Sequence, residues 1–284
     1  MSGPETPNAD QIAFWNGEAG QKWVDESKAL DALLAPFIAE ILTRADLKPG
    51  QSVMDIGCGA GALSLEAASL VGEEGGVLGV DVSEPLLSLA KERATTAKLP
   101  ARFVCADAST HRVTDLHDAI ISRFGVMFFD NPTAAFSNLR QNVNSHGRVV
   151  FCAWQSLAHN PWAMLPLKCA SEFLPEMPAP PLPGAPGPFG FADKDRVSSI
   201  LDQSGWQVEA IEAWKDKLVL PGDTLEESAQ FLLKLGPTAR LLSDAAIEPA
   251  VLEPCLLEEL AMAKTSDGSV RLAGATWIVT ATPR

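Results

Sequence analysis

The sequence predicts an α/β protein built on a doubly wound, mostly parallel sheet of seven strands. Short apolar runs alternate with helical patterns through the first half of the chain, as expected for parallel strands joined by crossover helices. A glycine-rich loop follows the first apolar run, in the stretch VMDIGCGAGAL at residues 53–63. The length of 284 residues predicts one large domain, or one core domain with a sizeable insertion, and the 46% apolar fraction allows a substantial core.

Each expected element follows from its hydrophobic period and its boundary residues. A helical region covers residues 12–45, where apolar side chains recur every three or four positions. The expected strands are residues 52–56, 76–80, 101–105, 116–122, 148–153, 206–220 and 268–282. The helices expected between them are residues 62–71, 84–95, 131–143 and 193–204, with two or more helices within 224–263. Asp130 or Asn131 would cap the helix that begins at Pro132.

These elements divide the chain into four parts. The stretch after the fifth strand contains many prolines, but it also carries Trp162 and Phe189. A disordered linker would not need such aromatic side chains, and we therefore expect an ordered lid. The parts are an N-terminal helical segment, a core with the glycine loop, this lid, and the rest of the sheet with a helical insertion at about 224–263: residues 1–45, 46–154, 155–192 and 193–284.

Composition narrows the function classes. The net charge of −14 disfavours a nucleic-acid substrate, because an acidic surface repels phosphates. The N-terminal stretch lacks the pattern of a secretory signal, and no run reaches the length of a membrane span. Five scattered cysteines without a CxxC pair predict buried, reduced thiols in a cytoplasmic protein, with no disulfide framework or zinc site. The absence of tyrosine excludes a tyrosine general base.

The glycine loop predicts a ligand that approaches the backbone closely. Gly57, Gly59 and Gly61 permit unusual dihedral angles and place no side chain between backbone and ligand. The helix that follows offers unpaired N–H groups at its start. The spacing Gly57-x-Gly59-x-x-Ala62 also satisfies a permissive dinucleotide fingerprint, so the loop alone leaves the ligand open.

Three carboxylates at successive strand ends favour an adenosine compound with a cationic end. Asp55 precedes the loop, where it would repel a pyrophosphate and attract a cation. Asp81 ends the second strand, where a carboxylate can accept hydrogen bonds from both ribose hydroxyls. Asp107 follows the third strand and can accept the exocyclic amine of adenine. Adenosine with an ammonium-bearing tail and no phosphate describes S-adenosylmethionine.

The motifs VMDIGCGAG, GVDVS and CADAS, in this order, resemble those of the class I S-adenosylmethionine-dependent methyltransferases. The segments FWNGEAGQKW and ISRFGVMFFDNP resemble the small-molecule branch that includes the ubiquinone and menaquinone methyltransferases. The resemblance covers residues 13 to about 153 and implies a Rossmann-like methyltransferase fold with a reversed last strand, whose N-terminal segment closes over the cofactor. The cofactor-binding residues that we expect are Trp15, Trp23, Asp55, Gly57, Cys58, Gly59, Gly61, Asp81, Val82, Asp107, Ala108, Arg123 and Phe124.

The resemblance and the lid together predict the substrate side of the site. By resemblance, Met127 and Phe128 lie near the reacting methyl group. Trp154 and the lid residues Asn160, Trp162 and Phe189 would line a substrate pocket. His159, at the carboxyl edge of the sheet, is the candidate catalytic residue, as a base or substrate contact. We expect no metal, because no second acidic cluster accompanies Asp130 and Asn131.

The sequence therefore predicts S-adenosylmethionine-dependent methyl transfer to a small, apolar or aromatic molecule, without nucleic-acid or membrane partners; a homodimer is left open. One alternative is a nicotinamide-dependent oxidoreductase, against which Asp55 and the missing tyrosine argue. A second is a catalytically inactive nucleoside-binding module, and a third is a methyltransferase that acts on RNA or protein. A basic rim around the cleft would favour the third.

Overall fold

A seven-stranded sheet forms the centre of the computed structural model, which describes residues 7–174, 176, 179, 181–234 and 236–284. The strand order is β3-β2-β1-β4-β5-β7-β6. β1 to β5 pair in parallel, and β7 runs antiparallel to both β5 and β6, which confirms the predicted sheet with a reversed last strand. The strands are β1 (Ser52–Ile56), β2 (Gly76–Asp81), β3 (Ala101–Cys105), β4 (His117–Arg123), β5 (Val143–Trp154), β6 (Trp206–Val219) and β7 (Arg271–Pro283).

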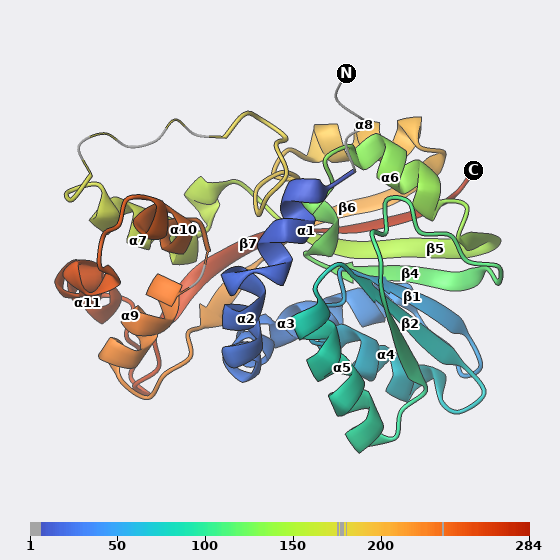
Figure 1. The fold of residues 1–284 in the computed structure, drawn as a ribbon, viewed down its shortest axis with the longest axis horizontal. Coiled ribbons are helices and arrows are strands. Elements are labelled where there is room, and N and C mark those ends of the chain that lie inside the picture. Colours follow the sequence, from blue (N-terminus) through green and yellow to red (C-terminus); the bar gives the residue numbers. More distant parts are fainter. Residues whose placement is uncertain (1–6, 175, 177–178, 180, 235) are drawn as a thin grey trace.

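Helices cover the sheet and extend beyond one end of it (Figure 1). α7, α9, α10 and α11 gather at one end of the long strands β6 and β7, and α1 and α2 lie between this group and the part of the chain that carries α4 and α5 (Figure 1). The helices are α1 (Ala9–Asn16), α2 (Glu18–Asp25), α3 (Ser27–Ala45), α4 (Ala62–Val71), α5 (Glu84–Ala97), α6 (Pro132–Leu139), α7 (Pro161–Ala170), α8 (Lys194–Gln203), α9 (Leu225–Lys234), α10 (Gly236–Asp244) and α11 (Glu253–Ala261). Among the residues described, no helix is both long and apolar enough to cross a membrane.

Most predicted bounds lie within three residues of the observed ones, and two predicted helices differ more. The single helical region expected over 12–45 is three helices, which are interrupted at Gly17 and Glu26. The helix expected over 131–143 ends at Leu139, because Val143 pairs with His117 of β4 and so begins β5. The pairing of β5 with β4 therefore ends the helix early, although residues 140–143 fit a helical pattern. The predicted cap is confirmed, since the Asn131 side chain accepts a hydrogen bond from the backbone N–H of Ala134 at 3.0 Å.

The lid segment is anchored to the core at its C-terminal end. Phe191 is only 2% exposed, and its ring lies 6.1 Å from the rings of Phe136 and Phe151. The segment also contains α7, a helix that the proline-rich pattern concealed. Residues 175, 177, 178 and 180, part of the predicted lid, lie outside the described residues.

The prediction of reduced, buried thiols throughout was wrong for three of the five cysteines. Cys169 of α7 and Cys255 of α11 form a disulfide, with 5.8 Å between their Cα atoms and a sequence separation of 86. Cys105 is exposed, whereas Cys58 and Cys152 are free and buried. The pairing depends on α7 and α11 packing together, which cysteine spacing does not reveal.

We expect the disulfide to stabilise the helices beyond the sheet. Replacing both Cys169 and Cys255 by serine should lower the free energy of unfolding by about 2–3 kcal/mol, because a cross-link over this separation restricts the unfolded chain. Urea unfolding of the wild type and the double variant measures the loss. Alkylation of the denatured, unreduced protein should modify the three free cysteines only, and modification of all five would contradict the pairing.

Candidate functional site

The loop after β1 packs backbone against backbone on the turn after β4. Gly57, Gly59 and Gly61 have φ values of 63°, 52° and 83°, a left-handed region that favours glycine. A Cβ atom on Gly57 would lie 2.6 Å from the Cα atom of Gly125, so neither position has room for a side chain. This contact fixes the loop at the carboxyl edge of the sheet, where β1 and β4 end side by side.

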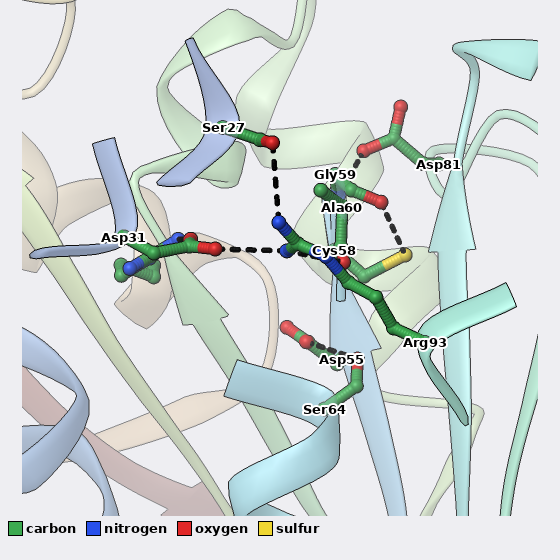
Figure 2. Close-up of polar contacts among 10 residues, drawn as sticks. Ser27, Asp31, Asp55, Cys58, Gly59, Ala60, Ser64, Asp81 and Arg93 are labelled. Atoms are coloured by element: carbon green, nitrogen blue, oxygen red, sulfur yellow. Dashed lines mark hydrogen bonds and ion pairs between the residues drawn. The ribbon is translucent and has the colours of Figure 1, made fainter. Parts of the chain in front are cut away.

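Asp81 holds the same loop from the end of β2 (Figure 2). Its carboxylate accepts hydrogen bonds from the backbone N–H groups of Gly59, at 2.7 Å, and Ser83, at 2.9 Å. Burial raises the pKa of Asp81, and these backbone hydrogen bonds oppose the increase. Each oxygen keeps a lone pair for a further donor, as a ribose diol requires.

Asp55 lies buried beneath the loop. The Ser64 hydroxyl donates a hydrogen bond to Oδ2 of Asp55 at 2.5 Å (Figure 2), whereas Oδ1 has no partner among the described residues. Burial raises the pKa of Asp55 to about 7, although the Ser64 hydrogen bond and the charge of Arg123 lower it. A buried carboxylate with a free oxygen is suited to a cationic ligand group.

Asp107 connects the edge of the sheet to the N-terminal segment. Its carboxylate accepts hydrogen bonds from the Asn8 side-chain amide and from the N–H and hydroxyl of Ser109, each at 2.8 Å. Asn8 also pairs with Asp130 through two hydrogen bonds of 2.7 Å. Asn8 was missed in the sequence because its partners are about 100 and 122 residues away.

Arg123, at the end of β4, belongs to a charged cluster with two residues that the sequence did not indicate. Asp31 of α3 lies 2.8 Å from Nη1 of Arg93 and 3.3 Å from Nη2 of Arg123. Nη1 of Arg123 has no partner within the described part of the chain. This cluster borders the glycine loop (Figure 2).

A cavity of about 210 Å³ extends along the glycine loop and on toward the helices beyond the sheet. It brings together most of the predicted site. The predicted residues that line it are Trp15, Trp23, Gly57, Gly59, Asp81, Val82, Asp107, Ala108, Arg123, Phe124, Met127, Phe128, Trp154 and Trp162.

The far part of this cavity is an apolar compartment. Its walls include Trp154, which stacks on Phe124 with 4.3 Å between ring centroids, and Trp162, 5.0 Å from Trp154. Three further wall residues come from outside the motifs: Leu218, Phe231 and Leu232. They were missed in the sequence because an ordinary apolar strand or helix face carries no chemical signature.

Six predicted residues do not line the cavity. Asp55, Cys58 and Gly61 lie next to it within or beneath the loop, and burial raises the pKa of the Cys58 thiol well above its usual value. Asn160 is buried, and its side chain hydrogen-bonds backbone groups of residues 155, 156 and 275. The ring centroid of Phe189 lies 6.3 Å from that of Trp162.

The structure does not bring His159 to the cavity. His159 is exposed and borders a separate, open hollow with Lys215 and Lys217 of β6. Its ring nitrogen Nδ1 lies 3.4 Å from the Ser156 hydroxyl. No cluster of three or more metal-ligating side chains occurs in the part of the chain that the structure describes.

Sheet order, glycine loop and carboxylate at the end of β2 together define a Rossmann-like domain of the kind that binds nucleoside cofactors. Residues 53–147 match the family described as "Methyltransferase domain". Residues 53–147 of the chain therefore carry a methyltransferase domain, which is built on this Rossmann-like sheet.

Similar proteins share the methyltransferase domain, but their names give different substrates. Phosphoethanolamine N-methyltransferase 1 of Zea mays is 30% identical over 112 residues, which are 39% of this chain and 22% of that protein. A tRNA (guanine(6)-N2)-methyltransferase of Thermus thermophilus is 43% identical over 82 residues, which are 28% of this chain and 24% of that protein. The matched segments thus span less than a quarter of either relative.

Among solved structures, magnesium protoporphyrin IX methyltransferase from Synechocystis PCC 6803, with bound S-adenosylhomocysteine, has the same fold. The two chains superpose with a TM-score of 0.55, over 97% of this chain and 99% of that chain, at 14% sequence identity.

Proposed function

We propose that this protein transfers a methyl group from S-adenosylmethionine to a small, apolar or aromatic molecule. One observation carries the proposal: a single cavity joins the glycine loop and its carboxylates to an apolar compartment walled by Trp154, Trp162 and Phe231. A cofactor held at the loop would present its methyl group toward that compartment. Assignment to the ubiquinone and menaquinone branch remains a prediction.

The residues at the loop fit the cofactor. Asp81 would accept hydrogen bonds from the ribose hydroxyls, and Asp107 would accept one from the adenine amine. Asp55 Oδ1 and Arg123 Nη1, both buried and without partners among the described residues, match the ammonium and carboxylate groups of the methionine part. A dinucleotide would instead place its pyrophosphate near Asp55, which disfavours an oxidoreductase.

The apolar compartment determines what the chain contributes to the reaction. The bound cofactor would supply an activated methyl group, so the protein needs chiefly to orient the acceptor and exclude water. Trp154, Trp162 and Leu218 have no titratable group, and no acid or base from the described residues joins them in the compartment wall. The acceptor would therefore enter as a competent nucleophile. His159, the predicted catalytic residue, would need to move to act, and the proposal does not depend on it.

The remaining expectations belong to the same proposal. A net charge of −14 favours a small molecule over the RNA substrate named for the Thermus relative. A cytoplasmic location would keep Cys169 and Cys255 reduced, which conflicts with their disulfide. Modification of only three cysteines in protein taken directly from cells would therefore argue against that location. Sedimentation of the purified chain would distinguish a monomer from a homodimer.

Calorimetric titration with S-adenosylmethionine, S-adenosylhomocysteine and NADH tests the cofactor. We expect the first two to bind and NADH not to bind. Asp81→Ala should weaken binding about 100-fold, because it removes the ribose acceptor and the hydrogen bond to Gly59. Asp195→Ala, an exposed position in α8, should bind like the wild type. Binding of NADH alone would refute the methyltransferase proposal, and binding of none would favour a non-catalytic module.

A further inference from the structure

Asp31 connects two arginines that come from different parts of the fold. Its Oδ2 lies 2.8 Å from Nη1 of Arg93 on α5, and its Oδ1 lies 3.3 Å from Nη2 of Arg123 at the end of β4. Figure 2 shows Asp31 and Arg93 facing each other beside the glycine loop. Asp31 itself belongs to α3, so three elements meet at one carboxylate.

Arg93 uses its remaining hydrogen bonds to hold the loop. Its Nη1 donates to the backbone carbonyl of Ala60 at 3.1 Å, and its Nη2 donates to the Ser27 hydroxyl at 3.1 Å (Figure 2). Ala60 lies within the glycine loop, and Ser27 begins α3. The Asp31–Arg93 pair therefore ties α3 to the loop that would hold the cofactor.

Arg123 is differently placed, because it lines the cavity. Among the described residues that do so, it is the only one with a cationic side chain, and its Nη1 has no hydrogen-bond partner. Two guanidinium groups share the single carboxylate of Asp31, which leaves one positive charge unpaired within the cluster. The side chains of Arg123 and Asp31 are 14% and 28% exposed, so solvent screens this charge only partly.

Asp55 is a second carboxylate on which the charge of Arg123 acts. Asp55 is buried with a free Oδ1, and its titration responds to the charge of Arg123. Without Asp31, Arg123 would be free to turn toward Asp55, and the two groups would neutralise each other. Asp31 therefore keeps apart two charges of opposite sign that a zwitterionic ligand could bridge.

We propose that Asp31 is a positioning residue for the cofactor. Asp31 holds the Arg123 side chain so that the free Nη1 of Arg123 meets the carboxylate of the cofactor's methionine part. Through Arg93, the same carboxylate couples that contact to the glycine loop and to α3. The inference rests on the proposed function, since it assumes S-adenosylmethionine as the ligand. It adds a residue on the N-terminal segment that does not itself line the cavity.

Two probes separate this role from a general effect on the fold. S-adenosylhomocysteine and 5′-methylthioadenosine share the nucleoside and the thioether, but only the first has the carboxylate and ammonium groups. Wild-type protein should prefer S-adenosylhomocysteine in calorimetric titration. Asp31→Asn should weaken the binding of S-adenosylhomocysteine roughly tenfold, which corresponds to the loss of one well-placed charged hydrogen bond. The affinity for 5′-methylthioadenosine should stay unchanged.

Two further variants complete the test. Asp46→Asn makes the same change at the C-terminal end of α3, away from the cavity, and should leave both affinities unchanged. Asp31→Glu keeps the carboxylate and should retain most of the preference. The readout is the ratio of two affinities measured on one variant, so partial unfolding of a variant cancels from it.

The outcomes are distinct. Unchanged or tighter binding of S-adenosylhomocysteine by Asp31→Asn would overturn the inference, because charge removal alone should favour the cofactor's carboxylate. Equally weaker binding of both probes would also overturn the inference, since Asp31 would then act only by holding the glycine loop. If wild-type protein binds neither probe, the proposed cofactor fails instead.

Discussion

Gly125→Ala should destabilise the protein by more than about 3 kcal/mol and abolish cofactor binding, because the added methyl group meets backbone on two sides. A Cβ atom on Gly125 would lie 2.5 Å from the carbonyl oxygen of Ile56 and 2.7 Å from the Cα atom of Gly57. A flexible side chain could move aside, whereas these atoms belong to the end of β1 and to the glycine loop. Relief therefore requires the two loops to separate, which displaces the groups that face the cofactor.

Gly76→Ala provides the matched control. Gly76 begins β2, and the nearest atom to an added Cβ would be the Pro100 carbonyl oxygen at 3.9 Å. The free energy of unfolding should stay within about 1 kcal/mol of the wild type, on the stabilising side, because alanine restricts the unfolded chain. Urea unfolding and titration with S-adenosylhomocysteine measure both variants. Wild-type stability and binding in Gly125→Ala would show that the two loops do not pack as described.

Local sequence signals predicted the elements that place the cofactor groups. β1, α4 and β3 have the predicted bounds, because apolar runs and glycines mark their ends within a few residues. Asp81 was predictable for the same reason, since the carboxyl end of a parallel strand determines where its side chain lies. Strand ends, helix ends and the residues at strand ends depend on neighbouring residues in the sequence, and hydrophobic periodicity therefore detects them.

Groups that meet across the fold were not predictable in this way. Asp31 reaches Arg93 and Arg123 across 62 and 92 residues, and no motif contains all three. Cys169 and Cys255 pair only because α7 packs against α11. His159 had the appropriate chemistry and position along the chain, yet the short turn at residues 157–159 leaves it exposed and outside the cavity.

Asp55→Asn should make the protein more stable at pH 8 and bind its cofactor more weakly. The pKa of Asp55 is about 7 in the folded protein, well above its ordinary value of 3.8, because burial disfavours the ionised form. The folded state therefore holds the proton more tightly than the unfolded state does. The contribution of Asp55 to stability is complete below about pH 4, and it is lost as the pH rises through 7.

The size of this effect follows from the difference between the two pKa values. A shift of roughly three pH units corresponds to about 4 kcal/mol of stability lost between pH 4 and pH 8. Asparagine is neutral throughout, so the pH dependence between 4 and 7 should flatten in Asp55→Asn. Urea unfolding at pH 5 and pH 8 measures the change, and an equal slope in both proteins would contradict the role of Asp55.

Cofactor binding should strengthen as the pH rises through 7, whereas stability falls. The ionised carboxylate of Asp55 destabilises the folded protein, but it is the form that binds a cationic ligand. At pH 6.5 the positive charge of the ammonium group of S-adenosylhomocysteine should lower the pKa of Asp55, so the carboxyl group should lose its proton to solvent on binding. Calorimetry in phosphate and in imidazole, which both buffer at this pH but differ in ionisation enthalpy, measures that release. Asp55→Asn should bind more than about tenfold more weakly, with no dependence on the buffer. Buffer-independent binding by the wild type would mean that Asp55 keeps its proton in the complex, and that the ammonium group is held elsewhere.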